Sequence, residues 1–199
     1  MRSWLRRRDD RDWRDVELLA LDFETTTGEP REAEPLSVGW VTVRHGRVHL
    51  ADAGYRLVAH DGHLPHAALP IHGLLPTDLS GGGSLDDVAD RLREVARDRV
   101  VVAHGAWIEH ALLGRLGVGH AGVVDTMAIV RRLDERDGGA PRAASLNATA
   151  RRFGVTPFRA HHAFGDALTT ALLLVVLATR LERARGRCPV DDLLRLGRT

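Results

Sequence analysis

An apolar segment at residues 16–23 ends in two carboxylates, and it constrains the fold of this chain more than any other feature. A short apolar run of this kind predicts a buried strand. Side chains on a strand alternate between its two faces, so Asp22 and Glu24 point to the same side, about 7 Å apart along the strand. Two such charges repel each other and are costly to desolvate, and a divalent cation would offset that cost. The alternative is a strand that runs out into a solvated acidic loop.

The remaining pattern predicts an α/β fold. Three strands in hairpin-like order precede alternating helices and strands, which favours a ribonuclease-H-like mixed β-sheet flanked by helices over an all-parallel sheet. A turn at Arg44–Arg47 joins the second and third strands, Ser84 and Ser145 look like helix N-caps, and 60–83 is expected to be a loop. After the strand at 16–23, strands are expected at 36–44, 47–58, 100–103 and 123–125, and helices at 85–97, 106–117, 126–134, 145–154, 163–184 and 190–196.

A chain of 199 residues predicts a single domain. We expect a charged N-terminal extension at 1–15, one main folded domain at 16–185 and a helical C-terminal tail at 186–199. No apolar run looks long enough to span a membrane, and residues 1–8 lack the apolar core of a signal peptide. The single cysteine, Cys188, excludes an internal disulfide and a cysteine zinc cluster. A cytoplasmic protein without membrane contact is the resulting expectation.

The charge is unevenly distributed along the chain. Residues 131–199 contain 13 arginines and 7 acidic residues, a net charge of +6, whereas residues 1–130 carry −5. An acidic part that binds metal, joined to a basic part, is consistent with a hydrolase that acts on a polyanion. Ordinary surface charge explains the same numbers. No glycine-rich phosphate-binding motif is present, so the sequence gives no indication of a nucleotide cofactor.

Three further polar clusters lie where expected strands or loops meet helices. They contain His104 with Glu109, Asp125 with Thr126, and His161 with Asp166. Each has an ordinary structural explanation on its own. An acid in the first helical turn interacts favourably with the helix dipole, an aspartate before a helix is a common N-cap, and a histidine is common in a loop.

Taken in order, these clusters resemble the DEDDh 3′→5′ exonucleases, the group that contains the proofreading epsilon subunit of bacterial replicative DNA polymerase, ribonuclease T and oligoribonuclease. The resemblance covers about residues 16–180. Five segments carry it: Asp-Phe-Glu-Thr-Thr at 22–26, Ile-His-Gly at 71–73, the His104–Glu109 segment, Asp-Thr at 125–126, and His161-x-Ala-x-x-Asp-Ala at 161–167.

The resemblance implies a metal-dependent phosphodiester hydrolase that uses two Mg²⁺ or Mn²⁺ ions. It implies that Asp22 bridges both ions, that Glu24 and Asp166 complete the first site, and that Glu109 holds the second. His161 is the implied general base, which suits an imidazole because it exchanges protons near neutral pH. The residues implied to contact the terminal nucleotide are Phe23, Thr25, His72, Gly73 and His104.

The chain departs from the family pattern at three places. Glu109 stands where the family has aspartate, Gly105 replaces asparagine, and Thr27-Gly28 replaces Gly-Leu. An active exonuclease on single-stranded DNA or RNA 3′ ends, with DNA favoured, is the main hypothesis. A catalytically weak or inactive nucleic-acid-binding accessory module is the alternative. A DNA polymerase or another replication or repair protein is a candidate partner. The apolar face of the helix at 163–184 would support either a homodimer or the core of one chain.

Overall fold

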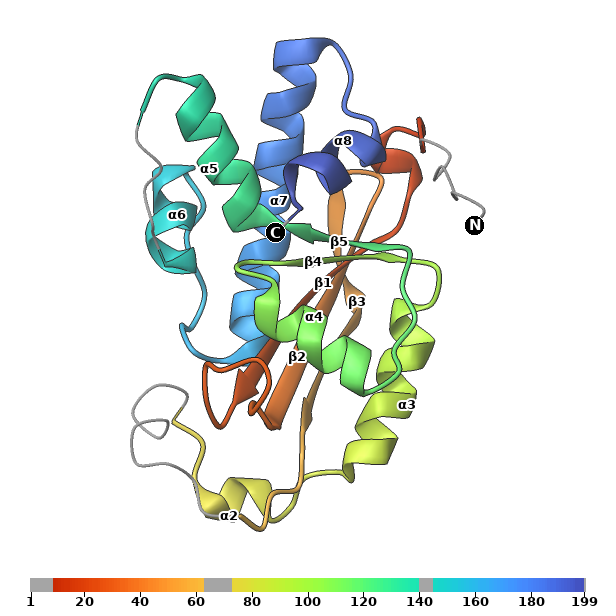
Figure 1. Cartoon of the computed structure of the whole chain (residues 1–199), viewed down its shortest axis with the longest axis vertical. Helices are drawn as coiled ribbons and strands as arrows, with labels where there is room; N and C mark the ends of the chain where they lie inside the picture. Colours follow the sequence, from red (N-terminus) through yellow and green to blue (C-terminus); the bar gives the residue numbers. More distant parts are fainter. Residues whose placement is uncertain (1–8, 63–72, 140–144, 199) are drawn as a thin grey trace.

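Five strands form one mixed sheet with helices packed on both faces (Figure 1). The computed structural model describes residues 9–62, 73–139 and 145–198. In chain order the strands are β1 (Leu18–Thr25), β2 (Pro35–Arg44), β3 (Arg47–Leu57), β4 (Val100–Ala103) and β5 (Gly122–Asp125). Their spatial order is β3-β2-β1-β4-β5; β2 is antiparallel to both β1 and β3, whereas β4 is parallel to β1 and β5 to β4. The predicted mixed sheet is therefore confirmed.

The helices form two groups, one on each face of the sheet. On one face, α5 (Thr126–Arg136), α7 (Ala163–Arg185) and α8 (Val190–Leu196) share a core cluster with β1 and β2. On the other face, α3 (Leu85–Ala96) and α4 (Trp107–Arg115) pack against the opposite side of β1. The remaining short helices in the described residues are η1 (Trp13–Asp15), α2 (Pro76–Leu79) and α6 (Leu146–Arg152).

The alternation of side chains along β1 decides where the two carboxylates point. Leu18 and Ala20 belong to the core cluster that contains α7, whereas Leu19 and Leu21 belong to the cluster that contains α3 and α4. Because successive strand residues face opposite sides, the positions at 22 and 24 continue the face that is covered by α7. The polar end of β1 therefore meets the beginning of that helix.

Local sequence signals account for most element boundaries. The side chains of Ser84 and Ser145 cap α3 and α6 by accepting hydrogen bonds from backbone N–H groups one turn on, and Asp125 caps α5. His45 and Gly46 both have positive φ angles, as a two-residue hairpin turn between β2 and β3 requires. The segment at 60–83, expected to be a loop, also contains the short helix α2. The first residue of α2 is a proline, and the side chain of Asp78 accepts a hydrogen bond from the backbone N–H of its N-cap residue.

Helix α7 corrects one sequence expectation. The sequence predicts no apolar run long enough to span a membrane. By length and composition alone, however, α7 is long enough, with a mean hydropathy of 1.6 over its most apolar stretch. Burial explains this composition, since 61% of the stretch is buried and Leu173, Leu174 and Leu177 are fully enclosed. Most of its apolar surface is thus core, which favours the single-chain explanation over a dimer interface.

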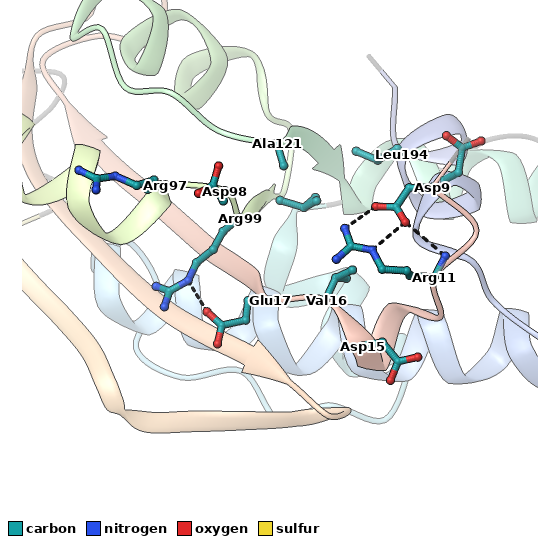
Figure 2. Close-up of a pocket in the computed structure, with 12 residues that line it drawn as sticks. Asp9, Arg11, Asp15, Val16, Glu17, Arg97, Asp98, Arg99, Ala121 and Leu194 are labelled. Atoms are coloured by element: carbon teal, nitrogen blue, oxygen red, sulfur yellow. Dashed lines mark hydrogen bonds and ion pairs between the residues drawn. The ribbon is translucent and has the colours of Figure 1, made fainter. Parts of the chain in front are cut away.

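The two terminal segments pack together at the other end of the sheet from the β1 carboxylates. Trp13 is buried in the core, and its backbone N–H donates to the carbonyl of Cys188. Nearby, a pocket of about 490 Å³ opens at the starts of β1 and β4 (Figure 2). Two ion pairs line it: Arg11 bonds Asp9 within the N-terminal segment, and Arg99 bonds Glu17 where β4 and β1 begin. Backbone hydrogen bonds attach the N-terminal segment to its surroundings, because the carbonyls of Arg11 and Arg14 accept from the N–H groups of Val190 and His45.

Candidate active site

Three carboxylates meet where β1 ends beside the first turn of α7. Ligand oxygens of Asp22, Glu24 and Asp166 all lie within 4.8 Å of one another. Asp22 and Glu24 come from one face of β1, as predicted, and Asp166 comes from a segment more than 140 residues later in the chain. Carboxylate oxygens at this spacing form a donor set that suits hard divalent cations.

A glycine on β2 allows α7 to come this close to the sheet. Gly39 pairs with Asp22 across the β1–β2 ladder. A Cβ atom at residue 39 would lie 2.3–2.4 Å from the backbone of Phe164 and Ala163, far inside van der Waals contact. Only glycine therefore lets the first turn of α7 rest directly on the strand and hold Asp166 next to Asp22. Sequence reasoning missed this residue, because nothing local marks a glycine as a contact site for a distant helix.

Glu109 brings a fourth carboxylate to the cluster. It lies in the first turn of α4 and is only 5% exposed. Its carboxylate forms a hydrogen bond with the backbone of Phe23, and its charge acts on Asp22. The longer side chain at this position thus still reaches the site.

The electrostatics of the cluster oppose full ionisation. Burial, followed by the charges of Glu109, Glu24 and Asp166, holds the pKa of Asp22 well above its ordinary value. Burial raises the pKa of Glu109 to about 8, and burial with repulsion from Asp166 raises that of Glu24 to about 7. Burial, joined by repulsion at Asp22, Glu24 and Glu109, thus raises the pKa of all four acids, and divalent cations would offset that cost, so the residues present fit a divalent metal site.

His161 lies on a strained turn just before α7. Its φ angle is +55°, and its backbone N–H donates a 2.9 Å hydrogen bond to Oδ2 of Asp166. This bond, with nearby histidine charge, partly offsets the rise in the pKa of Asp166 that burial causes. The imidazole itself is exposed. His161 and Asp166 are therefore held together through the backbone of one turn.

The neighbouring residue fixes this turn to the sheet. Nδ1 of His162 accepts a hydrogen bond from the backbone N–H of Gly165, which makes His162 the N-cap of α7. Its ring stacks on Tyr55 of β3, with centroids 4.7 Å apart and planes 18° from parallel. Tyr55 is the single tyrosine of the chain, but no sequence signal connects it to residue 162.

His104 is linked to the junction between β4 and α5. Its Nδ1 lies 2.9 Å from Oγ1 of Thr126, and that hydroxyl donates to the carbonyl of Ala103. Because the hydroxyl has only one proton, Nδ1 of His104 is the donor in their bond. Asp125, expected to be an N-cap, accepts from the backbone N–H groups of Met127 and Gly105, both at 2.8 Å.

The remaining predicted contact residues lie in β1 or in the 60–83 segment. The side chain of Phe23 is buried in the core beside α3 and α4, and its backbone forms the hydrogen bond with Glu109. Thr25 donates its hydroxyl proton to the carbonyl of Thr27. Gly73 is exposed and has a φ angle of +67°. His72 lies outside the described residues.

Charge alone makes three arginines of the basic C-terminal part candidate phosphate contacts: Arg151, Arg152 and Arg159. Arg152 has a structural role, because its two terminal guanidinium nitrogens pair with the buried carboxylate of Asp134 and join α6 to α5. The hydrogen bond raises the pKa of Arg152 above its ordinary value. Arg151 and Arg159 are exposed.

Known proteins resemble most of this chain in sequence. A model of the RNase T family, described as exonuclease, matches residues 19–174. The chain is 27% identical over 182 residues to a PolC-type DNA polymerase III of Thermotoga maritima, and 23% identical over 179 residues to that of Staphylococcus haemolyticus. These matches cover 88% and 87% of this chain but only 13% and 12% of the polymerases.

Solved exonuclease structures share the fold. Exonuclease X, solved in complex with 5′ overhanging duplex DNA, superposes with a TM-score of 0.66 at 22% identity, covering 91% of this chain and 99% of that one. Exonuclease I from Escherichia coli, solved with a dA16 oligonucleotide, gives a TM-score of 0.70 at 16% identity, covering 84% of this chain and 42% of that one. The fold is the ribonuclease-H-like exonuclease fold, as the sequence predicted. With its family model matched from β1 into α7, this chain belongs to the RNase T family of DEDD exonucleases.

Proposed function

We propose that this protein is a metal-dependent 3′→5′ exonuclease of the DEDDh type. It would release nucleoside 5′-monophosphates from single-stranded nucleic acid ends, with DNA favoured. The observation that carries this proposal is the cluster of Asp22, Glu24 and Asp166 oxygens within 4.8 Å, with Glu109 buried beside it. Exonucleases of the DEDD family use divalent metals, and four carboxylates are the oxygen ligands that Mg²⁺ and Mn²⁺ prefer.

The four carboxylates would hold two cations between them. Asp22, Glu24 and Asp166 form the compact part of the cluster, and Glu109 approaches it from α4. Two bound cations supply an activated water and stabilise the leaving oxygen of the phosphodiester. The high pKa values of Glu24 and Glu109 mean that these ligands release protons as the cations bind.

His161 would accept the proton of the attacking water on a ring nitrogen. Its imidazole is exposed, and the residue lies about one turn before Asp166 in the chain. The hydrogen bond from its backbone N–H to Asp166 holds the two residues close together. Imidazole is suited to this task because it both accepts and releases protons near neutral pH. His161→Ala should therefore slow turnover strongly while binding of an oligonucleotide is retained. A normal rate would remove this residue from the mechanism.

Two kinds of relative support DNA as the preferred polymer. The matched curated proteins are PolC-type DNA polymerases, and both exonuclease structures compared above were solved with DNA. Since the chain corresponds to about an eighth of those polymerases, association with a DNA polymerase or another replication protein is a proposal that follows from the same resemblance.

Asparagine variants of the cluster test the proposal. Asp22→Asn and Asp166→Asn each replace a charged ligand by a neutral one of nearly equal size. We expect either change to reduce release of nucleoside monophosphates from a single-stranded oligonucleotide by at least about a hundredfold. Asp86→Asn is the matched control, because Asp86 is exposed on α3. Equal product release by Asp22→Asn and wild-type protein would contradict the metal-site assignment.

A binding module with little turnover is the second candidate function. The observations that favour it are Gly105 and Glu109, which depart from the exonuclease pattern. The buried position of Glu109 beside Asp22 weakens this alternative, because the longer side chain occupies the site and does not turn away from it. Oligonucleotide binding without any cleavage in Mg²⁺ or Mn²⁺ would favour the binding module.

A further inference from the structure

Trp107 is a large aromatic side chain that the site described above leaves without a role. It is the first residue of α4 and is 49% exposed. Burying an indole normally stabilises a protein, and a half-exposed one that lines a pocket is available to stack on a ligand. The other tryptophans in the described residues, Trp13 and Trp40, are almost completely buried.

The indole is held in place by the loop beneath it. A Cβ atom at Gly105 would lie 2.6 Å from two ring atoms of Trp107 and 3.2 Å from the terminal methyl of Met127. Gly105 also has a φ angle of +77°, which disfavours other residues. The ring therefore lies directly on the glycine, and an asparagine side chain at this position would displace it. Gly105 and Trp107 form a matched pair, and one exposed ring face stays pre-positioned.

A pocket of about 390 Å³ opens beside this ring along α5. Trp107, Met127 and Ala128 form its apolar part. Its charged lining has three arginines and two acids: Arg131, Arg132, Arg198, Asp125 and Glu135. Arg132 is engaged with backbone carbonyls at the C-terminal end of α8. Arg131 is exposed, and among the residues that the structure describes it has no hydrogen-bond or ion-pair partner. The pocket thus combines an aromatic face with an available guanidinium.

Asp125 links the pocket to the carboxylate cluster. It lines the pocket, and its charge acts on Glu109. Two of the expected contacts of the terminal nucleotide lie elsewhere, since Thr25 ends β1 and Gly73 precedes α2, whereas Trp107 begins α4 and lines the pocket along α5. A strand whose 3′ end occupies the first location can extend its preceding nucleotides towards the second.

We propose that Trp107 is a stacking platform for a nucleobase on the 5′ side of the scissile phosphodiester, and that Arg131 binds a phosphate of the same strand. This proposal rests on the proposed exonuclease function. Aromatic rings stack on every base, and arginine binds phosphate through its planar fork, so the pair recognises single-stranded nucleic acid without reading sequence. The pocket would make the enzyme prefer chains over isolated terminal nucleotides.

Kinetics on two substrates separate stacking from a structural effect. The first is a short oligodeoxythymidylate. The second is the p-nitrophenyl ester of thymidine 5′-monophosphate, which has the terminal nucleotide but no base on the leaving-group side. Trp107→Ala should raise KM for the oligonucleotide about tenfold and leave hydrolysis of the ester unchanged, and Trp107→Phe should restore most of the loss. Leu85→Ala, which removes another exposed apolar side chain, is the control.

An abasic scan locates the stacked base without relying on turnover. Oligonucleotides with one abasic position, moved stepwise from the 3′ end, are bound with hydrolysis blocked by EDTA. One position should weaken binding to wild-type protein and have no further effect on Trp107→Ala. Arg131→Gln should reduce the slope of log Kd against log salt by about 0.7, and Arg97→Gln, far from the pocket, should leave it unchanged.

The outcomes distinguish this inference from the proposed function. Unchanged KM in Trp107→Ala, or equal losses on both substrates, would overturn the stacking platform while leaving an active exonuclease. Wild-type protein that binds the oligonucleotide but cleaves neither substrate would contradict the exonuclease function, and the abasic scan would still decide the platform. Wild-type protein that neither binds nor cleaves would refute both.

Discussion

Neutralising Glu109 should stabilise the metal-free protein, and increasingly so at high pH. The folded state raises the pKa of this buried carboxyl from 4.5 to about 8. The folded protein thus binds this proton more tightly than the unfolded chain, and its stability falls as pH rises between these two values. From pH 5.5 to pH 8 the penalty grows by about 1.4 kcal/mol for each pH unit, or about 3 kcal/mol in total. Glu109→Gln keeps the size of the side chain and removes this penalty.

The measurement is urea unfolding in EDTA at several pH values between 5.5 and 8. The difference in free energy of unfolding between Glu109→Gln and wild type should increase by up to about 3 kcal/mol over this range. Glu32→Gln serves as the control, because Glu32 is exposed. Saturating Mn²⁺ should make wild type the more stable of the two proteins at pH 8. The cation binds the ionised wild-type site more tightly than the site with glutamine, and so it stabilises wild type more. A difference that stays constant with pH would refute a buried, electrostatically opposed Glu109.

Three other perturbations test how the site is assembled. Gly39→Ala should abolish nuclease activity with little loss of secondary structure, because the new methyl group displaces the first turn of α7 and with it Asp166. Activity above a tenth of the wild-type value would contradict this. Tyr55→Ala should slow turnover and alter its pH profile through His162, and Tyr55→Phe should restore both; an unchanged profile would limit the stack to a structural purpose. Arg152→Gln leaves Asp134 buried and unpaired, so it should lower the free energy of unfolding in urea by about 2–4 kcal/mol. KM for the oligonucleotide should stay unchanged, and a raised KM would make Arg152 a substrate contact.

The fold could be predicted because its signals are local. The apolar run of β1, the serine caps of α3 and α6 and the two-residue hairpin each depend on neighbouring residues. Two features differ from the sequence prediction. The 60–83 segment contains α2 despite its glycines and prolines. Helix α7 is apolar over a length that could span a membrane, because most of that stretch is buried against the sheet.

The carboxylate cluster was predictable in its residue types, whereas its supports were not. Strand alternation placed Asp22 and Glu24 on one face, and the ordered motifs added Glu109 and Asp166. Gly39 carries no local signal for its contact with α7. The pairs Gly105–Trp107 and Tyr55–His162 depend equally on how the chain packs, and the burial of Phe23 follows from the strand face it occupies.

The central claim is tested most directly by the direction and metal dependence of cleavage. Purified protein is incubated with 5′-labelled single-stranded DNA and RNA oligonucleotides in Mg²⁺, in Mn²⁺ and in EDTA, beside the Asp22→Asn variant. The account predicts a ladder that shortens from the 3′ end in either metal, faster on DNA, and intact oligonucleotide in EDTA or with the variant. Intact oligonucleotides in every metal, or cleavage that persists in EDTA, would contradict it.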